Sequence, residues 1–284
     1  MLKKTNKSDF IFLFLKKNYF CPYFISKMSR KKIYFIIAFS LMAILVGGYF
    51  WFAYNKEYHF KNQEIILNDC DGEDCAEVSI NYMFCESPKA FAKIFNDSIQ
   101  RQLVKMLTAK DTLMDIEEAG KLFLTQYRSD KQQFEGISPY QIEVVDTIIY
   151  QSDVLISLQR FGYEYLGGAH PVGWTTFMNF KPTGAFYSQE ELFTDKEKVL
   201  ALAEKHFRET FNLSKNQEFS DGGFIFENDI FSLPKNIGFD KDNLILLYNP
   251  YEIAPYSTGI LEVKIPLSEV SPWLSFKLND AKRK

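Results

Sequence analysis

The sequence predicts an α+β protein in which two small α/β sub-domains with antiparallel sheets follow one N-terminal transmembrane helix. Three observations support this fold class. Residues 33–54 carry no charged side chain, residues 76–84 alternate between apolar and polar side chains, and apolar residues recur at helical spacing after Ser87. Apolar residues make up 46% of the chain and aromatic residues 17%, which is enough to build a packed core.

The uncharged segment 33–54 predicts the membrane helix, because 22 residues at about 1.5 Å each span roughly the hydrocarbon thickness of a bilayer. Arg30, Lys31 and Lys32 precede the segment, whereas no excess of cations follows it. The bias of cations to the cytoplasmic side then places residues 1–32 inside, as a basic tail, and the rest outside the cytoplasmic membrane, in the periplasm or another extracytoplasmic space. The alternative is a cleaved signal peptide, but the apolar run is longer than usual for one and no A-x-A site follows it.

Met28 begins a typical export signal, with Arg30 to Lys32 leading into the apolar run, so we expect synthesis to start there. Residues 1–54 hold nine Lys and Arg and one acid, which leaves 24 basic and 35 acidic residues for 55–284. That part therefore has a formal net charge of −11. Such an acidic domain argues against nucleic acid as a partner, since binding phosphates requires a basic face.

The cysteines fit an oxidising compartment. Cys70 and Cys75 flank the acidic turn 71–74, and we expect a disulfide between them, with Cys85 as a buried free thiol on a strand. A zinc site lacks the usual ligand spacing, and a calcium loop at 69–74 lacks the EF-hand pattern. No metal site is predicted.

After a linker at 55–74, residues 75–163 are expected to form the first sub-domain. It begins with the strand 76–84. Ser87 and Pro88 then predict the start of a helix that runs to about Leu107, and a second helix follows around 113–127. Two apolar runs, 142–150 and 154–165, predict a hairpin.

Residues 164–277 are expected to form the second sub-domain. A Pro-Gly turn at 181–184 predicts a hairpin of residues 174–180 and 185–187. Asp195 is a suitable N-cap for a helix over 196–212. Strands at 243–248 and 260–265 and a short helix at 267–273 complete the chain.

Two separated motifs carry a family resemblance. The first runs from Tyr165 through Gly167, Gly168 and His170, with Asn179 after it, and the second covers 249–259 with Tyr251 and Tyr256. Residues 75–274 resemble the domain family of unknown function shared by the lysozyme-sensing anti-sigma factor RsiV and the N-terminal region of the peptidoglycan deacetylase PdaC. The resemblance implies two α/β sub-domains, PdaC-like then RsiV-like, exposed to the cell wall. Neither a sigma-binding region nor a metal-dependent catalytic domain is evident.

The binding candidates are the residues of these motifs: Tyr165, Gly167, Gly168, His170, Asn179, Tyr251 and Tyr256. The two glycines and Pro171 could present the His170 ring at a surface, although a turn in which the ring bonds to backbone is the commoner role. Nucleophile and nucleotide motifs are absent, so no catalytic residue or cofactor is predicted. We expect a membrane-anchored binding module for peptidoglycan or a cationic wall-acting protein such as lysozyme. A wall-modifying hydrolase using His170 and a structural envelope protein are the alternatives.

Overall fold

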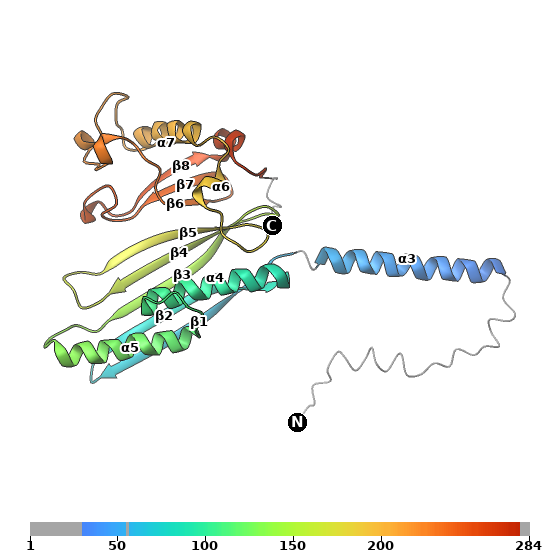
Figure 1. The fold of residues 1–284 in the computed structure, drawn as a ribbon, viewed down its shortest axis with the longest axis horizontal. Coiled ribbons are helices and arrows are strands. Elements are labelled where there is room, and N and C mark those ends of the chain that lie inside the picture. Colours follow the sequence, from blue (N-terminus) through green and yellow to red (C-terminus); the bar gives the residue numbers. More distant parts are fainter. Residues whose placement is uncertain (1–29, 55–56, 279–284) are drawn as a thin grey trace. The chain divides into compact units, whose positions relative to one another are not determined.

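The computed structural model describes residues 30–54 and 57–278 and divides the chain into two units, 1–56 and 57–284. In the first unit, helix α3 (Arg30–Tyr54) contains the predicted membrane segment (Figure 1). Within the described part of the chain, however, no helix meets the length and apolarity needed to cross a membrane. Met28 lies outside the described residues.

A five-stranded sheet forms the first half of the second unit (Figure 1). Its strands follow their order in the chain and are β1 (His59–Asp71), β2 (Asp74–Ser87), β3 (Gln141–Gln151), β4 (Ile156–Tyr165) and β5 (Val172–Phe180). All neighbours are antiparallel except β2 and β3, which are parallel. The expectation of antiparallel sheets therefore needs one correction: two helices connect β2 to β3 and return the chain to the end where β2 began.

Helices α4 (Lys89–Thr108) and α5 (Ile116–Gln133) are this connection, and they cover one face of the sheet (Figure 1). Their buried side chains, including Phe95 and Phe123, pack with Val78, Ile80 and other apolar residues of that face. Asp115 caps α5 by accepting from the Glu118 backbone N–H. The expected Ser87 cap of α4 is wrong, because Pro88 takes the N-cap position and the Ser87 hydroxyl donates to the Glu57 carbonyl oxygen.

A three-stranded antiparallel sheet forms the second half. Its strands are β6 (Asn236–Phe239), β7 (Asn243–Tyr248) and β8 (Leu261–Pro266), and the helices of this half are α6 (Gln189–Leu192), α7 (Lys196–Thr210) and α8 (Leu267–Val270). Asp195 caps α7 as expected. Phe207 of α7 is fully buried at the centre of a cluster of aromatic rings that includes Phe219, Phe226 and Tyr248. This second core is separate from the one under α4 and α5.

The two sheets meet where β6 lies against β4 and β5, on the face opposite α4. The Phe239 backbone N–H donates to the buried Ser157 hydroxyl of β4, and the Phe177 ring of β5 packs against Gly238, where a Cβ atom would overlap it. Phe177 also clusters with Ile245 and Leu247 of β7. The second sheet thus covers part of the helix-free face of the first.

Several elements differ from the expectations. Residues 59–71, expected as linker, form β1, because the turn at 71–74 folds them back along the whole of β2. Residues 185–187 form only a single bridge, Phe180 to Phe186, since β5 pairs along its length with β4 instead. The expected boundary between residues 163 and 164 lies inside β4, and the division into two sub-domains stays a prediction.

Candidate functional site

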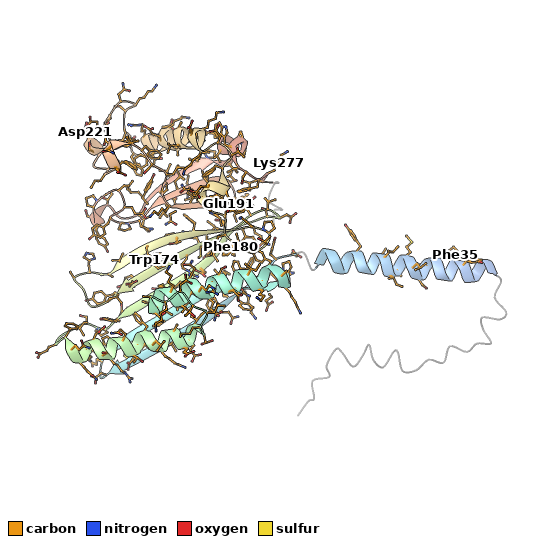
Figure 2. All side chains as sticks on the ribbon, viewed as in Figure 1. Phe35, Trp174, Phe180, Glu191, Asp221 and Lys277 are labelled. Atoms are coloured by element: carbon orange, nitrogen blue, oxygen red, sulfur yellow. A yellow bond between two sulfur atoms is a disulfide. The ribbon has the colours of Figure 1, made fainter. Side chains whose placement is uncertain are left out.

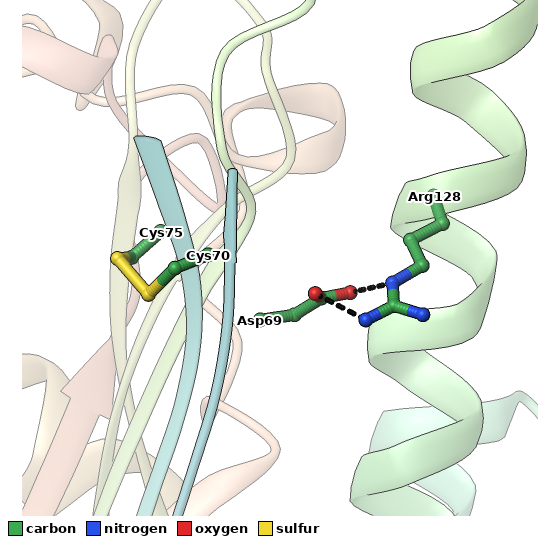
Figure 3. The surroundings of a disulfide bond; sticks show 4 residues. All are labelled: Asp69, Cys70, Cys75 and Arg128. Atoms are coloured by element: carbon green, nitrogen blue, oxygen red, sulfur yellow. Dashed lines mark hydrogen bonds and ion pairs between the residues drawn. A yellow bond between two sulfur atoms is a disulfide. The ribbon is translucent and has the colours of Figure 1, made fainter. Parts of the chain in front are cut away.

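The candidate site lies at one end of the five-stranded sheet, where the β1–β2 turn, the start of β3 and the β4–β5 loop meet. The strand directions bring Asp71, Gln141 and Tyr165 to this same end. A disulfide joins Cys70 and Cys75 across the β1–β2 turn, and beside it Asp69 forms a two-point ion pair with Arg128 of α5 (Figure 3). Disulfide and ion pair hold the acidic turn in a fixed position.

A cavity of about 470 Å³ opens at this end of the sheet. Its charged lining residues are Glu73, Asp74 and Glu77, and no lysine, arginine or histidine lines it. None of these three carboxylates has an ion-pair partner among the described residues, in contrast to Asp69 and Asp71, which pair with Arg128 and Lys131. The cavity therefore presents uncompensated negative charge.

Tyrosines line the other side of this cavity. Tyr163 and Tyr165 both project from β4, two residues apart and so on one face of the strand. Tyr165 lies opposite Gln141, which lies opposite Glu77, so these three residues share the helix-free face of the sheet. Phe161 follows on the same face and is 40% exposed. We call this surface the open face: Glu77, Gln141, Glu143, Phe161, Tyr163 and Tyr165.

The two sequence motifs are brought together beside this surface. The His170 ring stacks on Tyr256 with a centroid separation of 4.4 Å, and Tyr256 stacks on Tyr251 at 5.5 Å. The Tyr256 hydroxyl donates to the Pro171 carbonyl oxygen at 2.8 Å, which fixes the β4–β5 loop to the β7–β8 loop. Tyr251 is 62% exposed, so the stack offers a broad aromatic surface to solvent.

His170 makes contacts that favour a role in holding the loop. Its Nδ1 lies 3.0 Å from the Pro171 carbonyl oxygen, and its Nε2 lies 3.4 Å from the Tyr251 hydroxyl oxygen. Neither contact involves a carboxylate or a serine, threonine or cysteine side chain. The ring is exposed and could still contact a partner.

The two glycines of the first motif have different roles. Gly167 has a φ of +72°, and a Cβ atom there would lie 2.6 Å from Cγ1 of Ile137. Both the backbone conformation and the close approach therefore require glycine. Gly168 has open space around it and a φ outside the left-handed region. Only Gly167 is needed for the loop to reach its position.

Asn179 is not part of this site. It is 7% exposed, and its Nδ2 donates to the Ile237 carbonyl oxygen of β6 at 2.7 Å. Two more asparagines bond through their side-chain amides to the backbone on the outer edge of β5. Asn249 bonds to both the N–H and the carbonyl oxygen of Thr175, and Asn236 accepts from the Phe177 N–H. Sequence reasoning missed Asn236 and treated Asn249 only as part of a motif. The one sequence signal for this role of Asn249 was its position before Pro250 at the end of a predicted strand.

Two groups near the site have shifted pKa values. Burial raises the pKa of Glu164, the β4 residue between the two cavity tyrosines. Burial also raises the pKa of Tyr140 to about 12, together with the hydrogen bond from its hydroxyl to Asp130. Both shifts favour the neutral form of the side chain. Within the described ranges, no group of three or more His, Cys, Asp and Glu side chains could hold a metal ion.

Two known protein families match this chain, each over a different segment. Residues 70–173 match the family described as deacetylase PdaC, and residues 190–268 match the family described as a protein of unknown function, DUF3298. This confirms the resemblance stated from the motifs. The acidic cavity lies in the part that matches PdaC, whereas Tyr251 and Tyr256 lie in the part that matches DUF3298.

Solved structures show the same fold. A DUF3298-family protein from Bacteroides fragilis NCTC 9343 superposes with a TM-score of 0.66 at 18% identity, covering 78% of this chain and 96% of that chain. A DUF3298-family protein from Pseudomonas aeruginosa PAO1 gives a TM-score of 0.59, also at 18% identity, covering 79% of this chain and 99% of that chain. The search of curated proteins gave no match. At these identities the likeness concerns the fold alone.

Proposed function

We propose that this chain, in which a PdaC-like region precedes a DUF3298 region, is a membrane-anchored, extracytoplasmic binding module for a cationic wall-acting protein such as a lysozyme. The observation that carries the proposal is the cavity with three unpaired carboxylates, Glu73, Asp74 and Glu77, beside exposed aromatic side chains. Because no described lysine or arginine forms an ion pair with them, they favour a partner that brings its own lysines or arginines.

The charge of the whole domain supports the same class of partner. Residues 55–284 have a formal net charge of −11, which attracts a basic protein over a distance and raises its association rate. Acidic groups concentrated at one end of the sheet would then select the docking position. Peptidoglycan is the competing ligand, but its sugars do not require this concentration of unpaired carboxylates.

The aromatic groups supply the second requirement of a protein interface. Tyrosine is enriched in binding surfaces because it buries a large apolar area and keeps a polar group for hydrogen bonding. Phe161, Tyr163 and Tyr165 lie on the open face, and Tyr251 and Tyr256 lie on the adjoining loop. The loop and the open face together would form one continuous surface for a folded partner.

Two further observations support the location. The Cys70–Cys75 disulfide is typical of an oxidising compartment outside the cytoplasm. Residues 33–54 are uncharged and follow Arg30, Lys31 and Lys32, and the described large apolar side chains of α3, such as Phe35, Phe39 and Leu45, are exposed. A lipid environment would cover these side chains.

The binding proposal is tested by titrating the full-length protein in nanodiscs with hen egg-white lysozyme. A triple variant, Glu73→Gln with Asp74→Asn and Glu77→Gln, should weaken binding about tenfold, from about 0.5 kcal/mol for each exposed charge pair. The affinity should also fall as the salt concentration rises.

A matched control removes the same number of charges elsewhere. Glu218→Gln with Asp221→Asn and Glu227→Gln neutralises three exposed acids of the DUF3298 region, and should leave the affinity within about twofold. Equal loss in both triple variants would mean that only net charge matters and would contradict a defined site. Binding of soluble peptidoglycan fragments without lysozyme binding would assign the surface to the wall polymer instead.

The anchor is tested separately. Fusions of a periplasm-active reporter to the C-terminus should be active, and the native protein should sediment with membranes after alkaline washing. An active cytoplasmic reporter at the same position, or recovery in the soluble fraction, would overturn the proposed location and leave the binding test unaffected.

A further inference from the structure

A second cavity, of about 620 Å³, lies where α4, β5 and β6 meet, and it shares no lining residue with the acidic cavity. This volume is within the range of about 300 to 1,000 Å³ that is usual for small-molecule sites. Figure 2 labels Trp174 on β5, one of the residues that line this cavity.

The charge of this cavity is opposite to that of the domain. Lys105 of α4, Arg160 of β4 and Lys235 before β6 line it, and no acidic side chain does. Arg160 is neutralised by a two-point ion pair with Asp146, at 2.6 and 2.8 Å. Lys105 and Lys235 are exposed and have no ion-pair partner among the residues that the structure describes. Two free ammonium groups therefore remain for an anionic ligand, in a domain with a large acidic excess.

A buried acceptor without a partner lies at the far end of the same cavity from Trp174. Asn179 lines the cavity and is 7% exposed, and its Oδ1 has no hydrogen-bond partner in the described part of the chain. The orientation of the amide is fixed, since Nδ2 must face the Ile237 carbonyl oxygen at 2.7 Å. Oδ1 itself has less than 1 Å² of accessible surface, and Asn179 lies five residues from Trp174 on β5 and so on the other face of the sheet, so we do not place the ligand against it.

The remaining wall contains aromatic and amide side chains among aliphatic ones. The Trp174 ring lies over Gly162, where a Cβ atom would overlap it. Gln102 and Gln189 add polar groups to the cavity wall. A flat ring surface beside amide groups suits the apolar face and the hydroxyls of a sugar.

From these observations we infer that this cavity binds an anionic sugar, a carboxylated or phosphorylated hexose. Its anionic group pairs with Lys105 and Lys235, and its ring lies against Trp174. This site is independent of the proposed protein-binding surface, because the two cavities share no residue.

The test is ligand-observed NMR with the full-length protein in nanodiscs, using four probes. Glucuronate and glucose 6-phosphate are anionic sugars, glucose is the neutral sugar, and inorganic phosphate is the anion without a sugar. At least one anionic sugar should bind about tenfold or more tightly than both glucose and phosphate. Equal binding of phosphate would mean a simple anion site and would overturn the inference, as would binding of glucose with the same affinity or no binding of either anionic sugar.

A pair of variants locates the site. Lys105→Gln with Lys235→Gln changes only exposed side chains and should weaken binding of the anionic sugar about tenfold. The control, Lys110→Gln with Lys241→Gln, removes two exposed lysines that do not line the cavity and should leave binding unchanged. If both pairs weaken binding equally, the sugar is bound elsewhere and the assignment fails.

Discussion

Asn249 and Thr175 are joined by two hydrogen bonds that connect the second sequence motif to the edge of the five-stranded sheet. Oδ1 of Asn249 accepts from the Thr175 backbone N–H at 2.8 Å, and Nδ2 donates to the Thr175 carbonyl oxygen at 3.0 Å. Asn236 bonds in the same region to Phe177. Side-chain amides thus take the place that a further strand would have along β5, and they position the Tyr251 loop beside the open face.

Replacing Asn249 by alanine should lower the free energy of unfolding by about 2 to 3 kcal/mol. Two hydrogen bonds are lost. Thr175 is only 4% exposed, so its backbone N–H is left buried without a partner. Urea denaturation measures the change. Asn216→Ala, at an exposed position, is the control and should shift stability by less than about 0.5 kcal/mol. An unchanged denaturation midpoint in Asn249→Ala would show that these bonds do not hold the loop.

Breaking the buried ion pair of Asp146 and Arg160 should lower the free energy of unfolding by more than Asn249→Ala does. Both residues are almost fully buried, so Asp146→Asn leaves an uncompensated guanidinium charge and should destabilise the fold by about 3 to 5 kcal/mol. The double variant Asp146→Leu with Arg160→Met removes both charges and should recover at least half of that loss. Thermal unfolding followed by circular dichroism compares the three proteins. A double variant less stable than the single one would contradict this explanation.

Gly167→Ala should destabilise the β4–β5 loop, whereas Gly168→Ala should not. Alanine at Gly167 meets both the positive φ and the side chain of Ile137, with an expected cost of about 1 to 3 kcal/mol. Gly168 has open space, so its replacement should change stability by less than about 1 kcal/mol in either direction. Equal effects of the two substitutions on the unfolding midpoint would contradict the loop geometry.

The Cys85 thiol should make stability depend on alkaline pH. Burial raises its pKa from 9.0 to about 11, although backbone hydrogen bonding at Ser87 acts in the opposite direction. Below pH 9 both folded and unfolded chains keep the proton. As the pH rises from 9 to 11 the unfolded chain ionises first, so a stabilisation of about 2 to 3 kcal/mol is progressively lost.

This effect is measured as the difference in unfolding free energy between the wild type and Cys85→Ala. The difference at pH 7 reports packing alone, and it should change in favour of the alanine variant by about 2 to 3 kcal/mol at pH 11. The folded wild type should also resist thiol reagents at pH 8, because the thiol is buried and protonated. A difference independent of pH, or rapid modification of the folded protein, would contradict the assigned environment.

The sequence predicted those elements whose signals are local. Asp195 and the helical spacing after it fix α7, and the strict alternation over 76–84 fixes most of β2. β1 was missed because three apolar residues, 65–67, occur in a row, and its pairing depends on the hairpin at the disulfide. β6 has only four residues, too few for a period to be recognised.

The sequence motifs named some residues of the candidate site, such as Tyr165, but neither its acidic residues nor its geometry. The motifs with His170 and Tyr256 were recognised, yet their contact depends on how the second sheet packs on the first, which no local pattern encodes. For the same reason Asn179 was grouped with the site, although it lies at the junction of the sheets. The acidic residues of the β1–β2 turn were seen as a solvated turn, because their proximity to Tyr163 and Tyr165 is set by the pairing of β2, β3 and β4.

Hydrogen–deuterium exchange of the full-length protein with and without bound lysozyme tests the central claim most directly. We predict that lysozyme slows exchange in peptides covering 71–77, 161–171 and 249–259, and leaves 196–210 unchanged. Protection confined to α7 and the segments around it, with no change at the acidic turn and its neighbouring tyrosines, would contradict the proposed binding surface.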